Sequence, residues 1–108
     1  MKGHVLDQDI LDDVVRRIVE AAQPEKIILF GSAASGWMGP HSDLDLLIVK
    51  EGAQRRALAG KIYDNLHGAG VAVDVIVVTP TDIERYKDSH ALVIKPALQE
   101  GKVVYESA

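Results

Sequence analysis

The segment DLDLLIV, residues 43–49, places two carboxylates, Asp43 and Asp45, at the start of an otherwise apolar run. Side chains alternate between the two faces of a β-strand, so both aspartates are expected on one face, about 6.5 to 7 Å apart. The opposite face then carries Leu44, Leu46 and Ile48. Two carboxylates beside a hydrophobic core repel each other and lose hydration, and a divalent cation offsets both costs. We therefore interpret the segment as a core strand whose first residues hold a metal ion, for which Mg²⁺ is suited by its preference for oxygen ligands.

A third aspartate, Asp74, interrupts the β-prone run VAVDVIVV at residues 71–78. Its same-face neighbours, Ala72 and Ile76, are apolar, so a charged group there needs a cation, a hydrogen-bonding shell or a raised pKa. If this strand lies beside the strand at 43–49, Asp74 completes a three-carboxylate cluster able to hold two metal ions about 3.5 to 4 Å apart. Such a cluster is suited to reactions at a triphosphate.

A Gly-Ser pair, Gly31 and Ser32, follows the apolar run KIILF at residues 26–30. A glycine lets backbone approach a phosphate without a Cβ in the way. Free N–H groups at the start of a helical turn, together with the Ser32 hydroxyl, can also face an anion. The pair alone is a weak signal, but it becomes specific beside two aspartates one loop later and a third on the next strand.

The alternation of apolar patterns predicts one α/β domain, residues 1–108, with a small mixed β-sheet flanked by helices. The predicted helices cover residues 6–22, 53–67, a short segment that starts with the capping pair Thr81 and Glu84, and 90–100. The predicted strands cover residues 26–30, 43–49, 71–78 and, as a short edge strand, 102–106. Residues 31–42 are expected to form a loop with one or two helical turns.

Composition excludes several classes of protein. The chain has no cysteine, which excludes disulfides, a thiolate zinc site and a cysteine nucleophile, and favours the cytoplasm. The first residues are too polar for a signal peptide, and no apolar run approaches the roughly 20 residues of a membrane span. The net charge of −4 argues against direct binding of nucleic acid, which usually requires a basic surface. A small molecule or a protein is the expected partner.

The segments GSAASGWMGPHSDLDLLIV, from Gly31, and VDVIVV, from Val73, together resemble a known signature. It is the Gly-Ser, Asp-x-Asp and third-Asp pattern of the DNA polymerase beta-like nucleotidyltransferase superfamily, and most closely of its minimal nucleotidyltransferases. The resemblance implies transfer of a nucleoside monophosphate, commonly AMP from ATP or another NTP, with two Mg²⁺ ions. It assigns nucleotide binding to Gly31, Ser32 and Ser42, and metal binding and catalysis to Asp43, Asp45 and Asp74.

The same resemblance implies a protein partner. Many minimal nucleotidyltransferases are antitoxins encoded beside a HEPN-domain toxin that they modify on tyrosine. So short a chain leaves the cleft with one wall, so a partner or a second copy is expected to supply the other.

One departure from the family pattern leaves an alternative open. Many relatives carry arginines after Gly-Ser, where this chain has Ala33 and Ser35. Arginine would neutralise charge on the transferring triphosphate. The candidate replacements are Lys50, Arg55, Arg56, Lys87 or a partner chain. The alternative function is a weakly active or inactive antitoxin of the same fold, which neutralises its partner by binding.

Other phosphate-binding classes fit the sequence less well. Gly31 and Gly36 have the P-loop interval, but Trp37 and Met38 stand where Lys and Ser or Thr are required. No G-x-G-x-x-G motif follows a strand, which excludes the dinucleotide fold. DVIVVTP resembles the phosphorylation strand of response regulators, but their aspartate lies near the end of the strand, where this chain has Val78. Glycosyltransferases with Asp-x-Asp need a longer chain.

Overall fold

A four-stranded mixed sheet forms the centre of the computed structural model, which describes residues 4–5, 7–31, 34, 37–38, 44–88 and 94–107. Its strands are β2 (Lys26–Phe30), β4 (Leu44–Val49), β5 (Val73–Val78) and β6 (Lys102–Glu106), in the spatial order β5-β4-β2-β6. β2 pairs antiparallel with both β4 and β6, whereas β4 and β5 run parallel. The predicted mixed sheet is confirmed, with β6 at an edge.

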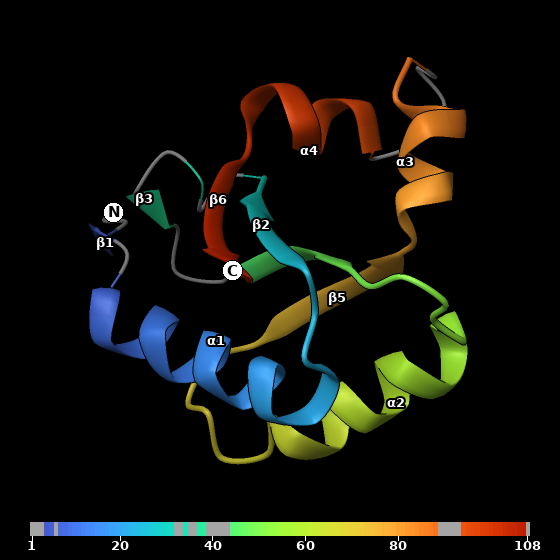
Figure 1. Ribbon diagram of the computed structural model, residues 1–108. Helices are drawn as coiled ribbons and strands as arrows, with labels where there is room; N and C mark the ends of the chain where they lie inside the picture. Colours follow the sequence, from blue (N-terminus) through green and yellow to red (C-terminus); the bar gives the residue numbers. More distant parts are fainter. Residues whose placement is uncertain are drawn as a thin grey trace.

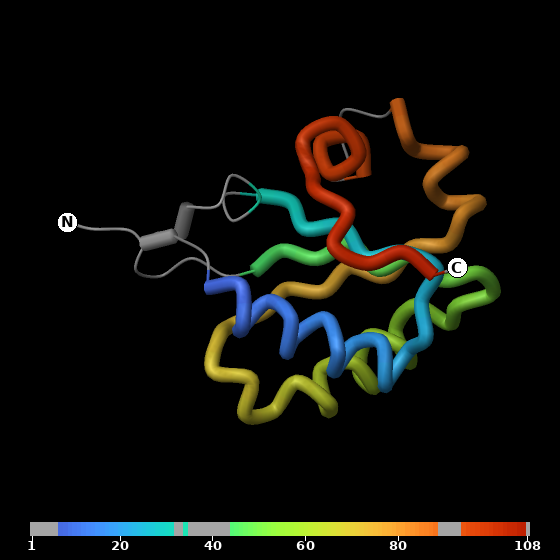
Figure 2. The backbone as a smooth tube through the Cα atoms, turned by 60° about the vertical axis from the view of Figure 1, so that its left-hand side comes forward, coloured from blue at the N-terminus to red at the C-terminus, as the bar shows by residue number. Residues whose placement is uncertain are grey.

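Helices form a layer on each side of this sheet (Figure 1). One layer holds α1 (Gln8–Ala22) and α2 (Arg55–Asn65), and the other holds α3 (Pro80–Tyr86) and α4 (Ile94–Glu100). Figure 2 shows the sheet between the layers, with α1 and α2 below it and α4 above it. The predicted α/β class is therefore confirmed. Within the described residues, none of these helices has the length and apolar character that crossing a membrane requires.

Two hydrophobic cores lie on the two faces of the sheet, and strand alternation separates them. Leu44, Leu46 and Ile48 of β4 pack in the core between the sheet and the helices α1 and α2. Leu47 and Val49 of the same strand pack in the second core, with residues of α4. The predicted division of side chains along β4 is confirmed.

The start of α3 corrects one prediction. Thr79, rather than Thr81, is the N-cap: its hydroxyl accepts a hydrogen bond from the Asp82 N–H at 3.0 Å. The Asp82 carboxylate in turn accepts one from the Thr79 N–H at 3.0 Å, which completes a capping box. Pro80 explains the difference, because proline has no N–H and is favoured at the first helical position. The helix therefore begins there, and Thr81 and Glu84 lie inside it.

A second, two-stranded sheet was not predicted. β1 (His4–Val5) pairs antiparallel with β3 (Trp37–Met38), inside the segment expected to be a loop. Two-residue strands carry no periodic pattern, and their pairing joins positions far apart in the sequence. The loop prediction is therefore wrong at residues 37–38.

Candidate active site

The structure brings Asp45 and Asp74 together on neighbouring parallel strands. The register of β4 and β5 pairs these two residues directly, and paired strands lie about 4.7 to 4.9 Å apart. Both side chains belong to the face that α3 and α4 cover, because the residues two further along, Leu47 and Ile76, pack in that core. Asp45 is half-buried and Asp74 is exposed. Two carboxylates thus lie side by side at the start of two strands.

Gly31 lies beside Asp45 on the other side. It follows Phe30, the last residue of β2, which pairs with Asp45 across the antiparallel ladder. Its φ is +73°, in the left-handed region that favours glycine. The Ala34 N–H donates to the Gly31 carbonyl at 3.2 Å, so the chain turns directly after the strand. Gly31, Asp45 and Asp74 therefore stand in a row across one end of the sheet.

Three of the predicted site residues, Ser32, Ser42 and Asp43, lie outside the described residues, as do Ala33 and Ser35. Their assignments remain predictions. Of the six predicted site residues, the structure therefore places Gly31, Asp45 and Asp74.

The carboxylates placed here fit a magnesium ion. Mg²⁺ is usually held by one or two protein carboxylates and keeps its other positions for water and substrate phosphates. Asp45 and Asp74 would supply oxygen ligands from the same register position on two adjacent strands. Among residues 7–31, 44–88 and 94–107, no group of three or more His, Cys, Asp or Glu side chains is arranged to hold a metal. The third carboxylate of the predicted metal site, Asp43, lies outside the described residues.

Three of the four cations considered as substitutes for the absent arginines make contacts elsewhere, and the fourth, Arg56, lies away from the paired aspartates. Lys50 follows the last residue of β4, at the opposite end of that strand from Asp45, and its Nζ donates to the Gln23 carbonyl at 3.0 Å. The other contacts are ion pairs of 3.1 Å, Arg55 with Asp82 and Lys87 with Glu84. Arg56 is exposed on α2, which also follows the far end of β4.

Sequence reasoning missed Tyr63. Its hydroxyl, carried by α2, accepts a hydrogen bond from the Val75 N–H at 2.8 Å. Val75 follows Asp74 on β5, which is an edge strand with an otherwise open side. Tyr63 thus fixes the backbone next to a candidate catalytic carboxylate. Neither spacing nor composition signals this contact, because it depends on how α2 lies against β5.

An apolar groove of about 400 Å³ follows Asp74 along the same face of β5. Its walls come from β5, α3 and α4, with one residue of α2. The lining residues are Arg55, Ile76, Val77, Val78, Asp82, Tyr86 and Ile94. Ile76 is two residues beyond Asp74, so the groove begins one side-chain step from that carboxylate.

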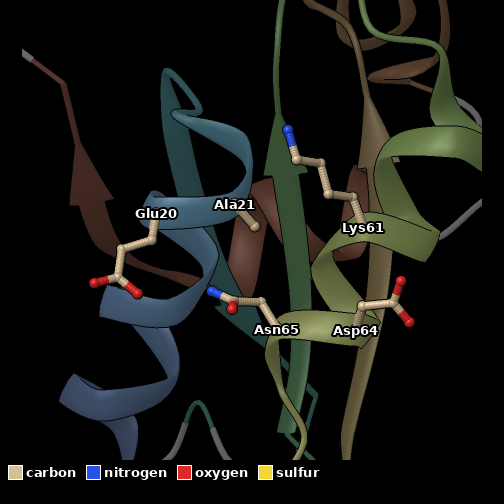
Figure 3. Close-up of a pocket in the computed structure, with 5 residues that line it drawn as sticks. All are labelled: Glu20, Ala21, Lys61, Asp64 and Asn65. Carbon is tan, nitrogen blue, oxygen red and sulfur yellow. The ribbon is translucent and has the colours of Figure 1, made fainter.

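A second pocket, of about 370 Å³, lies between α1 and α2 on the opposite side of the sheet. Its walls are formed by Glu20, Ala21, Lys61, Asp64 and Asn65. Figure 3 shows the Glu20 and Asp64 carboxylates pointing away from each other. The arrangement does not resemble a metal site, and it is far from the paired aspartates in the fold.

Comparison with solved structures supports the same fold. A protein of Sulfolobus solfataricus assigned as a nucleotidyltransferase has a TM-score of 0.60 at 19% identity, over 91% of this chain and 78% of that chain. A structure of the toxin–antitoxin pair MntA–HpeT has a TM-score of 0.63 at 14% identity, and the match covers 94% of this chain and 75% of that chain. It was solved as a mutant with two aspartates, separated by one residue, replaced by glutamate. No curated protein matches the chain significantly.

The sequence itself carries the family assignment. The profile of the nucleotidyltransferase domain matches residues 11–104, which include all six predicted site residues, the strands β2, β4 and β5, and the first part of β6. The chain therefore belongs to the nucleotidyltransferase domain family.

Proposed function

We propose that residues 1–108 form one catalytic domain that transfers AMP from ATP to a hydroxyl group of a partner protein. The observation that carries this proposal is the register that sets Asp45 beside Asp74 next to the Gly31 turn. Two Mg²⁺ ions, held by Asp43, Asp45 and Asp74, would neutralise the phosphates and lower the pKa of the attacking hydroxyl. Gly31, Ser32 and Ser42 would bind the nucleotide.

The roles proposed for these residues imply where the nucleotide and the acceptor lie along the row. The phosphates lie toward the Gly31 end of the row, so the acceptor approaches from the β5 side. The acceptor oxygen forms a bond to the α-phosphorus as the bond to the β-phosphate oxygen breaks. Pyrophosphate leaves, and the hydroxyl proton passes to the Asp74 carboxylate. The exposed position of Asp74 is consistent with an acceptor that arrives from solvent.

A toxin is the partner that we propose, with this chain as its antitoxin in the cytoplasm. The structural likeness to the MntA–HpeT toxin–antitoxin pair supports this choice. The acceptor would be a tyrosine of a HEPN-domain toxin. Its flanking segment would lie in the apolar groove beyond Asp74 and supply the second wall of the cleft, in place of a second copy of this chain.

Transfer of label tests the enzymatic part of the proposal. The purified chain is incubated with α-labelled ATP, Mg²⁺ and the protein encoded beside it. We expect label on the partner with wild type, none with Asp45→Asn, and normal labelling with the control Asp64→Asn, which changes an exposed carboxylate of α2 on the other side of the sheet. Equal labelling by wild type and Asp45→Asn would contradict the mechanism.

Neutralisation without catalysis is the second candidate, favoured by Ala33 and Ser35 in place of arginine. The same variants separate the two functions. A catalytic antitoxin loses protection of the host cell with Asp45→Asn, whereas a binding antitoxin still protects and still co-purifies with the toxin.

A further inference from the structure

The Asp45 carboxylate occupies the space that a side chain at Gly31 would need. A Cβ built on Gly31 would lie 3.2 Å from Asp45 Cγ and closer still to Oδ2. We propose that Gly31 is a positioning residue, whose missing side chain seats the Asp45 carboxylate for metal binding. This inference rests on the proposed function, and it adds a second role to the one proposed above for Gly31, which is to let backbone approach a phosphate.

The surroundings of Asp45 explain why this space matters. On one side β5 brings Asp74 to the same register position, and on the other side the chain leaves β2 at Gly31. A methyl group at Gly31 would displace the carboxylate oxygen, which can turn away because it is the end of a side chain. A turned carboxylate loses the position from which it shares a cation with Asp74. The expected damage is therefore to metal affinity more than to folding.

Gly52 provides a matched control for this substitution. Its φ is +71°, against +73° at Gly31, so alanine suffers the same backbone strain at both positions. A Cβ on Gly52 would meet nothing within 4 Å. The two variants Gly31→Ala and Gly52→Ala therefore differ in whether the new methyl group meets the Asp45 carboxylate.

Binding of Mn²⁺, followed by the electron paramagnetic resonance of the free ion, measures the effect without any reaction. Mutation of a group that orients a metal ligand typically lowers metal affinity about 10- to 100-fold. We therefore expect the Mn²⁺ Kd to rise at least about tenfold in Gly31→Ala. The Kd of Gly52→Ala should stay within about twofold of wild type. Both variants should lower Tm by similar amounts, since they share the strain.

Removing the carboxylate gives the decisive test. In Asp45→Ala the nearest remaining atom of residue 45 would be its Cβ, 3.5 Å from the added methyl group, which is an ordinary contact. We expect Gly31→Ala to have no further effect on Mn²⁺ affinity in that background. If Gly31→Ala leaves the Kd unchanged, or raises it equally with and without the Asp45 carboxylate, the inference is wrong.

The phosphate role gives a different result. A Gly31→Ala variant that binds ATP more weakly in metal-free buffer, with normal Mn²⁺ affinity, would show that Gly31 acts on the phosphate alone and would overturn the inference. Failure of the proposed function is seen separately, as a wild type that binds Mn²⁺ through Asp45 yet labels no partner. If Gly31→Ala unfolds where Gly52→Ala does not, recovery of the fold by adding Asp45→Ala supports the same contact.

Discussion

The two faces of the central sheet differ in the side chains that they present. The face beneath α1 and α2 is continuous hydrophobic core, and from β4 it takes Leu44, Leu46 and Ile48, all fully buried. The face toward α3 and α4 has a smaller core, and on this face the first side chains of β4 and β5 are Asp45 and Asp74. Alternation along a single strand thus separates residues that stabilise the fold from residues proposed for chemistry, so we expect substitutions at neighbouring positions to have unrelated effects.

The largest expected effect is on activity. Asp45→Asn keeps the shape of the side chain and removes the charge that holds a cation, so we expect the transfer rate to fall at least about 10³-fold, or about 4 kcal/mol of transition-state stabilisation. Its Tm should stay close to that of wild type. Thermal unfolding followed by circular dichroism measures the Tm. If Asp45→Asn loses activity only because it unfolds, the two faces do not have separate roles.

The adjacent residue should show the reverse behaviour. Leu46 is fully buried beneath α1 and α2, so Leu46→Ala is expected to lower the free energy of unfolding by about 2 to 5 kcal/mol. Urea unfolding measures the loss, and activity per folded molecule should be unchanged. Val103→Ala is the control, because Val103 is 53% exposed and its change should stay within about 0.5 kcal/mol. A specific loss of activity in folded Leu46→Ala would show that the faces are coupled.

A smaller effect is expected at the contact between α2 and the edge strand β5. Tyr63→Phe removes the acceptor of the Val75 N–H, at a cost of about 0.5 to 1.5 kcal/mol. Hydrogen exchange at Val75 should become faster, while exchange at Ile28 in the central strand β2 stays the same. Unchanged exchange at Val75 would show that the Tyr63 hydroxyl does not stabilise β5.

The smallest effect concerns the cap of α3. The Thr79 backbone N–H, the main cause, holds the pKa of Asp82 below its usual value. A lowered pKa in the folded state means that this carboxylate stabilises the fold above the unfolded pKa of about 3.9, and that the contribution disappears as the pH falls below it. Asp82→Asn should therefore unfold more easily than wild type at pH 7, and the difference should shrink as the pH falls through the lowered pKa of the folded state. Thr79→Ala should cost about 1 kcal/mol at pH 7. A difference between wild type and Asp82→Asn that does not shrink as the pH is lowered would contradict this.

Much of the fold could be predicted because local pattern and tertiary structure agree. The run at 26–30 is β-branched and bounded by glycine, and β2 covers the same residues. The division of β4 into two faces follows from alternation alone. The pairing of residues 4–5 with 37–38 could not be predicted, because so short a contact leaves no pattern in either segment.

The sequence predicts which residues could form the site, but it does not predict how they are arranged. Carboxylates in apolar strands are costly, so Asp45 and Asp74 stood out, but their shared register depends on which strands are neighbours. The contact between Gly31 and the Asp45 carboxylate is a matter of side-chain volume, which sequence spacing does not encode. For the same reason, the sequence alone does not distinguish a glycine that makes room for a ligand from one that makes room for a neighbouring side chain.

Asp45 also has a consequence for how β4 finds its place between β2 and β5. A slip of one residue would turn every side chain of a strand to the other face. Such a slip would bring the Asp45 carboxylate into the core beneath α1 and α2, where a charge without a partner is strongly disfavoured. A strand of uniform apolar residues would discriminate less between the two registers. The carboxylate that suits the strand for metal chemistry thus also penalises its misfolded alignment.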